Sequence, residues 1–196
     1  MNTTNLYLVI LEVLAVSLIM IVFTYYRDRR KFKDPGRYNW KATLLTIVML
    51  SIIGLVCTTY ISVKVDGQLV TPRDFIILFS ALVYGPVVGT PVALVLGSGR
   101  FVVGGIAAVS CAISCVTALA LGSVLWYLNR GKAPDMTAST AMMFFAKCIS
   151  LSLIMLYNPG GNPLTLELIT LTVFASVASM IIAMYHYRKF VVKKRV

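Results

Sequence analysis

Charged residues are scarce in this sequence, and acidic residues are the scarcest. Only 13% of the 196 residues are charged, with 18 Lys and Arg against 7 Asp and Glu, while 59% are hydrophobic. A water-soluble domain has about a quarter of its residues charged, so this shortage predicts an integral membrane protein. The formal net charge of +11 is concentrated in loops and at the C-terminus, which is typical of membrane proteins. We therefore expect no nucleic-acid partner.

The residues that bind metals or act as bases are also few. The chain has one histidine, His186, and four cysteines, which all lie in apolar runs: Cys57, Cys111, Cys115 and Cys148. No paired CxxC motif or histidine cluster accompanies them, so we expect no disulfide framework, no metal and no cofactor. A membrane enzyme is disfavoured because no catalytic group of residues is visible.

Six hydrophobic segments of about the length that crosses a bilayer follow one another. They are Leu6–Tyr25, Ala42–Val63, Phe75–Leu96, Phe101–Leu128, Thr140–Tyr157 and Leu168–Tyr185. No basic stretch or small-residue cleavage site marks the first segment as a signal peptide. The fold class that we predict is therefore an all-α integral membrane protein.

Basic residues fix the expected orientation. Seven crowd the first loop: Arg27, Arg29, Arg30, Lys31, Lys33, Arg37 and Lys41. Five more lie in the tail: Arg188, Lys189, Lys193, Lys194 and Arg195. Cytoplasmic loops carry such an excess of Lys and Arg, so the N-terminus is expected outside and the C-terminus inside. This orientation requires an odd number of crossings.

A break in the third hydrophobic segment gives the odd number of crossings. Glycine and proline interrupt it at Gly85-Pro86, and proline removes a backbone donor from a helix. We predict that Asp74–Tyr84 enters from outside, turns at Gly85-Pro86, and returns as Val87–Ser98. The chain then has five full transmembrane helices plus a broken re-entrant helical hairpin. The alternative is a single kinked span at 75–96.

The hairpin brings two arginines to the same side of the membrane. Arg73 and Arg100 would lie at its two mouths on the outer side, and paired guanidinium groups suit a planar carboxylate. The alternative is that both are interfacial anchors whose charges reach the headgroups.

The segment after Arg100 carries a stripe of small residues. Most of the stripe is explained by close helix packing, but Cys111 and Ser114 share its face and offer weak polar contacts to a small ligand. Arg100 and Cys111 would lie ~16 Å apart along an unbroken helix. We therefore expect Gly104-Gly105 to break the helix.

Two charges, Glu12 and Lys147, lie within spans. A charge inside a bilayer is costly and normally finds a partner. We predict that the two form an intramembrane charge pair, with a proton relay as the alternative.

These motifs resemble the five-transmembrane LytS-type sensor domain of bacteria. The resemblance is carried by Arg73-Asp74, by Leu82-Val83-Tyr84-Gly85-Pro86-Val87-Val88-Gly89, by Gly99-Arg100-Phe101-Val102-Val103-Gly104-Gly105, and by Ser110-Cys111-Ala112-Ile113-Ser114. It extends to Glu12 and the basic first loop, and so to nearly the whole chain. The chain departs from the family's pattern at Thr71-Pro72, at Gly99 and at Lys147, where kinase-linked members often carry Glu.

The resemblance implies a signal receptor. The domain precedes a histidine kinase or a diguanylate cyclase in such proteins, and members that sense pyruvate use two Arg, a Cys and a Ser, which match Arg73, Arg100, Cys111 and Ser114. We expect residues 1–187 to form the sensor domain and 188–196 a basic tail toward an output domain missing from this chain. The expected setting is the bacterial cytoplasmic membrane, with lipid around a homodimer.

An importer is the alternative function. Substrate-capture membrane subunits and small-solute transporters have a similar length, six hydrophobic segments and Gly-Pro turns. The Arg100 motif and the Cys111/Ser114 pair favour the sensor.

Overall fold

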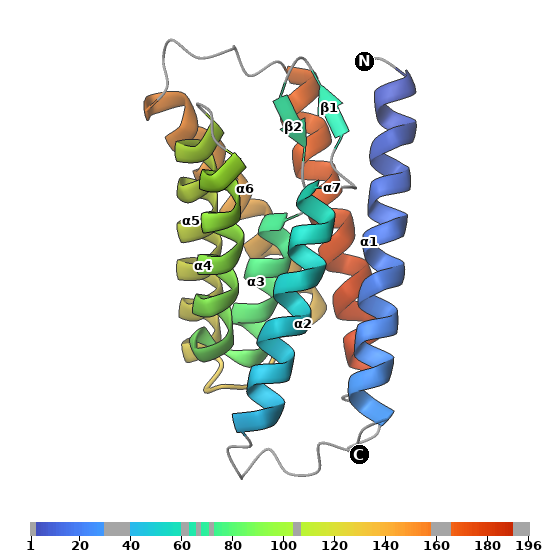
Figure 1. The fold of residues 1–196 in the computed structure, drawn as a ribbon, viewed down its shortest axis with the longest axis vertical. Coiled ribbons are helices and arrows are strands. Elements are labelled where there is room, and N and C mark those ends of the chain that lie inside the picture. Colours follow the sequence, from blue (N-terminus) through green and yellow to red (C-terminus); the bar gives the residue numbers. More distant parts are fainter. Residues whose placement is uncertain are drawn as a thin grey trace.

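Seven helices and one short β-hairpin make up the computed structural model (Figure 1). It describes residues 3–29, 40–59, 63–65, 68–70, 73–103, 107–157 and 166–189. In chain order the elements are α1 (Thr3–Arg29), α2 (Trp40–Thr59), β1 (Val63–Val65), β2 (Gln68–Val70), α3 (Arg73–Tyr84), α4 (Pro86–Val103), α5 (Ala107–Leu128), α6 (Met136–Tyr157) and α7 (Leu166–Tyr187).

Five of these helices are long and apolar enough to cross a membrane. Their spans are Thr4–Tyr25, Trp40–Thr59, Cys111–Leu128, Met136–Leu156 and Leu166–Tyr187. At about 1.5 Å per residue such helices approach or exceed the ~30 Å of a bilayer's hydrocarbon core. The predicted all-α membrane fold with five full crossings is thus confirmed.

Helices α3 and α4 form the predicted re-entrant hairpin. Gly85 separates them with a φ of 81°, a conformation that glycine adopts at little cost, and the chain reverses direction there (Figure 1). The 12 residues of α3 span only ~18 Å. The alternative of one kinked span at 75–96 is therefore wrong.

The second arm is longer than predicted. Helix α4 continues through Gly97 and Gly99 to Val103 instead of ending at Ser98. Glycine is common inside transmembrane helices, where it lets neighbouring helices approach. The added Cβ of a residue at position 99 would lie 3.0 Å from the Leu55 side chain of α2, so this glycine is a packing residue rather than a helix end.

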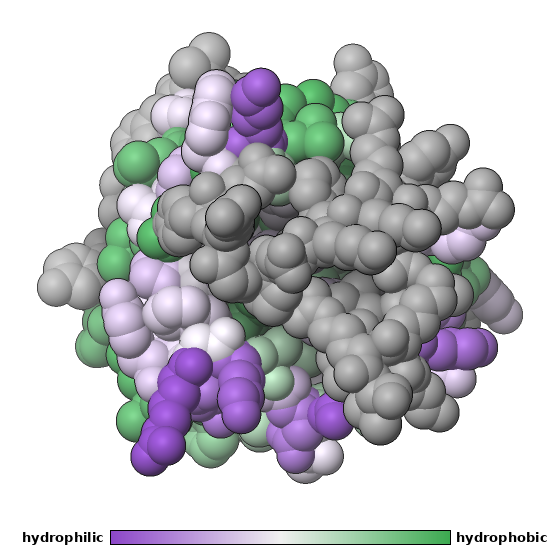
Figure 2. Space-filling view, turned by 90° about the horizontal axis from the view of Figure 1, so that it is seen from below, coloured by the Kyte–Doolittle hydropathy of each residue, from purple (hydrophilic) through white to green (hydrophobic). Residues whose placement is uncertain are grey.

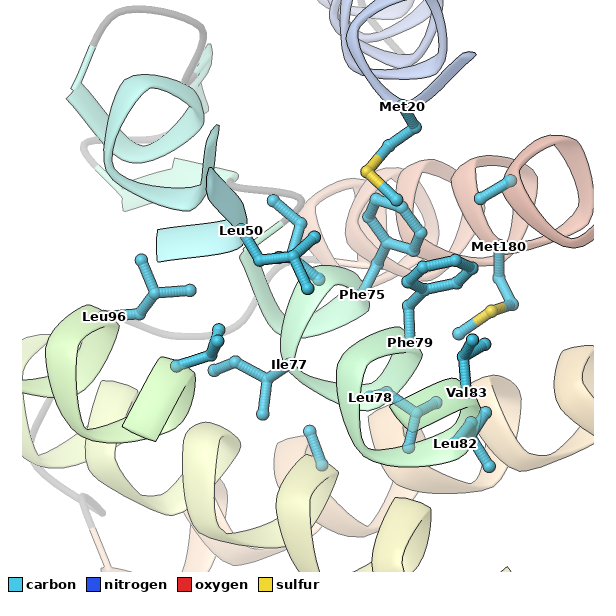
Figure 3. Close-up of a cluster of buried hydrophobic side chains, with 14 of the residues drawn as sticks. Met20, Leu50, Phe75, Ile77, Leu78, Phe79, Leu82, Val83, Leu96 and Met180 are labelled. Carbon is cyan, nitrogen blue, oxygen red and sulfur yellow. The ribbon is translucent and has the colours of Figure 1, made fainter. Parts of the chain in front are cut away.

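Helix α3 lies at the centre of the bundle. Every residue from Arg73 to Val83 is buried, and α3 packs against α2, α4, α5, α6 and α7. Figure 3 shows Phe75 and Phe79 of α3 among side chains from the surrounding helices, which include Met20, Leu50, Leu96 and Met180. The surrounding helices thus shield α3, which is too short to span, from lipid.

Small residues allow this close packing. A Cβ added at Gly89 of α4 would lie 2.9 Å from the Cβ of Ala81 in α3, and one added at Gly122 of α5 would lie 2.7 Å from the same atom. Ala81 is therefore held between two glycines, as in membrane helix pairs with small residues at the interface.

The β-hairpin was not predicted. Strands β1 and β2 pair antiparallel, with Val63 opposite Val70, and lie beside α1 and α7 at the end of the bundle where the N-terminus lies (Figure 1). The segment predicted to run to Val63 ends instead at Thr59. The signal was present in the sequence, because Asp66-Gly67 stands between Val63-Lys64-Val65, in which polarity alternates, and a second short run rich in apolar residues.

Candidate functional site

Three charged side chains meet at the first turn of α3. Asp74 contacts Arg73 through Oδ1, which lies 3.3 Å from Nε, and contacts Lys147 of α6 through Oδ2, which lies 2.5 Å from Nζ. The exposed fractions of the three residues are 8% for Arg73, 5% for Asp74 and 4% for Lys147. One buried carboxylate therefore bridges two buried cations.

Arg73, Asp74 and Lys147 together form a charge cluster, and its location at the start of α3 suits the acidic member, Asp74. An aspartate in the first turn of a helix interacts favourably with the helix dipole, and buried charges persist in a bilayer only when they find partners. Two cations against one carboxylate leave a formal charge of +1. The charge cluster is thus electrostatically suited to an additional anion.

Thiols and hydroxyls of α5 lie next to the charge cluster. Helix α3 packs on α5, and Arg73 at the start of α3 lies in the neighbourhood of Cys111 and Cys115 of α5. The Sγ atoms of these two cysteines are 3.9 Å apart. Ser114, on the same face of α5, shares a hydrogen bond of 2.5 Å with Ser150 of α6. The structure therefore brings Arg73, Cys111 and Ser114 to one buried region.

The fourth predicted ligand residue is placed only by its backbone. Arg100 lies in α4, close to the helix end at Val103, and its side chain is outside the described residues. A Cβ added at Gly97, one turn earlier, would lie 3.9 Å from Sγ of Cys115. Since α4 and α5 run antiparallel side by side (Figure 1), the backbone of Arg100 lies near the level of Cys111.

Arg100 and Cys111 are not separated by the ~16 Å that one unbroken helix would place between them. Helix α4 ends at Val103 and α5 begins at Ala107, so Arg100 and Cys111 belong to two neighbouring helices. Gly104 and Gly105, expected to form the break, lie outside the described residues.

Two expectations about charged residues need correction. Arg73 was expected to lie unpaired with other protein charges at one mouth of the hairpin; it does begin α3, but it is buried and bound to Asp74. Lys147 was expected to pair with Glu12, but its ammonium contacts Asp74. The two carboxylate oxygens of Glu12 are buried and have no hydrogen-bond partner among the described residues.

The helix arrangement explains the different partner of Lys147. Helix α1, which carries Glu12, packs mainly on α7, whereas α6 packs on α5 and α7 and also contacts α3. Asp74, at the start of the central α3, is therefore the nearer carboxylate. The signal that pointed to it was its place as the one acidic residue in the hydrophobic hairpin.

Comparisons with known proteins identify the domain. Residues 28–190 match the protein family described as "5TMR of 5TMR-LYT", while no curated protein and no solved structure matches the chain. The matched range holds the charge cluster, Arg100, Cys111 and Ser114, but starts after Glu12, to which the resemblance was expected to extend. The chain therefore belongs to the 5TMR-LYT family, and most of it is the five-transmembrane receptor domain of that family, a LytS-type sensor module within a multi-pass integral membrane protein.

Proposed function

We propose that the domain binds a small carboxylate, with pyruvate as the preferred ligand, and passes the signal to a cytoplasmic histidine kinase or diguanylate cyclase. The observation that carries this proposal is the buried charge cluster with its formal charge of +1. Of the three guanidinium nitrogens of Arg73, only Nε is hydrogen-bonded to another described residue. The terminal guanidinium nitrogens have no partner among the described residues and are the donors that bind a carboxylate in a bidentate manner.

The chemistry of a 2-oxo acid fits the neighbouring groups. Its planar carboxylate suits Arg73 and Arg100, and its carbonyl oxygen accepts hydrogen bonds, which the Ser114 hydroxyl donates well and the Cys111 thiol weakly. Because Ser114 and Cys111 lie one turn apart on α5, both would contact the same end of a three-carbon ligand.

Charge at the two ends of the bundle supports the proposed orientation. Exposed basic residues gather at the end where α7 finishes: Lys41, Arg130, Lys132, Arg188 and Lys189. Figure 2 looks onto this end and shows hydrophilic residues on it, with hydrophobic residues along the sides. An excess of Lys and Arg favours the cytoplasmic side, which directs α7 and the basic tail from residue 188 onward toward an output domain.

Cysteine labelling tests the orientation. In a variant without the four native cysteines, Lys132→Cys and Leu166→Cys place single exposed thiols at opposite ends of the bundle. An impermeant reagent added to intact bacteria should label only Leu166→Cys. Labelling of Lys132→Cys alone would reverse the orientation.

Isothermal titration of the purified 196-residue protein with pyruvate, lactate and acetate tests the ligand. A hydrogen bond to a charged group contributes about 1.5–3 kcal/mol, so Arg73→Ala should weaken pyruvate binding about tenfold to more than a hundredfold. Lys132→Ala, which removes an exposed cation, is the control and should bind normally. Equal affinity in wild type and Arg73→Ala would overturn the site, and pyruvate uptake into proteoliposomes would favour an importer.

A further inference from the structure

The two cations that Asp74 bridges are arranged as they would be around a bound carboxylate. We propose that Lys147 is a further ligand-binding residue of the carboxylate site, and that Asp74 is a built-in competitor that holds Arg73 and Lys147 in the position where a ligand's carboxylate is bound. This inference rests on the proposed function and adds two residues to it. Neither residue follows from the four-residue pattern that the resemblance supplied.

The carboxylate of Asp74 sets the spacing of the two cations. Asp74 uses one oxygen for each partner: Oδ1 faces Nε of Arg73 and Oδ2 faces Nζ of Lys147. The two oxygens of a carboxylate are separated by the same distance in Asp74 as in any small organic acid. The gap between the two cations is therefore the width of one carboxylate group.

Lys147 is also connected to the predicted ligand residues. Ser150 lies one turn after Lys147 on α6, and its hydroxyl is hydrogen-bonded to that of Ser114. Arg73, in turn, begins α3, which packs on α5 in the neighbourhood of Cys111. The buried polar region is therefore shared between α3, α5 and α6, and Lys147 is the cation that α6 contributes to it.

The net charge of the cluster also favours a bound anion. With Arg73, Asp74 and Lys147 the sum is +1, and one ligand carboxylate brings it to zero, which is favourable in a medium of low dielectric constant. Removal of Lys147 would make the sum zero before any ligand binds, so the ligand would add an uncompensated charge. Removal of the Asp74 charge would leave +2 and two cations without their internal partner.

Titration of four proteins with pyruvate tests the proposal: wild type, Asp74→Asn, Lys147→Met and Arg73→Ala. We expect Asp74→Asn to bind at least tenfold more tightly than wild type, because the competing charge is gone. Lys147→Met should bind at least tenfold more weakly. The matched controls Asp135→Asn and Lys132→Met alter exposed residues at the start of α6 and in the turn before it, and should leave the affinity unchanged.

The outcomes separate this inference from the proposed function. If wild type binds pyruvate and Arg73→Ala does not, but Lys147→Met binds like wild type, the inference alone fails. If wild type binds none of the 2-oxo acids tested, both fail. Should Lys147→Met not fold, Asp74→Asn decides the matter: tighter binding supports the competitor role, while unchanged or weaker binding overturns it, since a purely structural Asp74 would not oppose the ligand.

Discussion

Helices α3 and α1 each bury one carboxylate inside the bundle, with opposite results. Asp74 of α3 contacts two cations, whereas both oxygens of Glu12 in α1 lack a hydrogen-bond partner among the described residues. Helix α3 is surrounded by five other helices. Helix α1 lies at the edge, with Leu11, Leu14 and Leu18 exposed around Glu12. The enclosed α3 meets a cation from a neighbouring helix, Lys147 of α6, in addition to its own Arg73, whereas no ion pair joins Glu12 of the peripheral α1 to another described residue.

The difference assigns separate roles to the two carboxylates. Asp74 links α3 to α6 through a contact between residues 73 positions apart, so it helps to hold the re-entrant hairpin in the bundle. Glu12 lies within electrostatic reach of Lys147 but makes no ion pair with it, since the ammonium is bound to Asp74. We therefore expect stability to depend on the charges around α3 far more than on Glu12.

The largest effect should follow removal of Lys147. Breaking a buried ion pair by deleting one partner typically costs about 3–5 kcal/mol, because the other charge stays buried, and Arg73 remains to offset part of this for Asp74. We expect Lys147→Met to lower the free energy of unfolding by about 3 kcal/mol. Denaturant unfolding of the protein in detergent micelles gives the value.

A double-mutant cycle sharpens this result. The losses caused by Asp74→Asn and Lys147→Met should not add: the double variant should lose less stability than the sum of the two single losses, because the contact between the two side chains can be lost only once. If the double variant is as unstable as the sum of the two single variants, Asp74 and Lys147 act independently and the difference between α3 and α1 loses its main support.

Substitution of the glycine in the turn between α3 and α4 should cause the second-largest loss of stability. Gly85 has a positive φ, and an added Cβ would lie 2.8 Å from Cε2 of Trp126. A residue with a side chain in such a conformation costs about 1–3 kcal/mol, so Gly85→Ala should destabilise the protein by about 2 kcal/mol or more.

Gly131 supplies a matched control for the turn. It also has a positive φ, of 75°, but lies in the exposed turn between α5 and α6, where an added Cβ would be 3.2 Å from Trp126. Gly131→Ala should therefore cost less than Gly85→Ala in the same unfolding measurement. Equal costs would mean that the hairpin turn is no more constrained than a surface turn.

Much of the fold follows from physical patterns in the sequence. The uneven charge of the loops required an odd number of crossings, and Gly85-Pro86 marked the segment that turns back. The length of α4 was missed because the returning arm was expected to end at Ser98, just before Gly99, whereas a glycine next to a packed side chain such as Leu55 favours close contact. The β-hairpin was missed because the apolar segment before it was extended too far.

The arrangement of the candidate site was predictable only where its signal was local. Cys111 and Ser114 were identified because residues three apart share a helix face. The partner of Lys147 is a long-range contact, and neither depth nor periodicity indicates which helices are neighbours. Glu12 was chosen as the other charge inside a span, while the actual partner, Asp74, lay at the end of a segment and beside Arg73, where it looked like an ordinary boundary residue.

The smallest effect should come from Glu12→Gln. The substitution keeps the size of the side chain and removes a buried carboxyl group that has no hydrogen-bond partner among the described residues, so no ion pair is lost. An amide buried without a partner costs no more than a carboxyl group buried in the same way. We expect the unfolding free energy to change by about 1 kcal/mol or less, toward greater stability.

Asp74→Asn, the same change of carboxylate to amide on α3, should instead destabilise the protein. Thermal unfolding of both variants in one detergent makes the comparison direct. If Glu12→Gln lowers the melting temperature as much as Asp74→Asn does, then Glu12 stabilises the fold through Lys147, and α1 is part of the same charge network as α3.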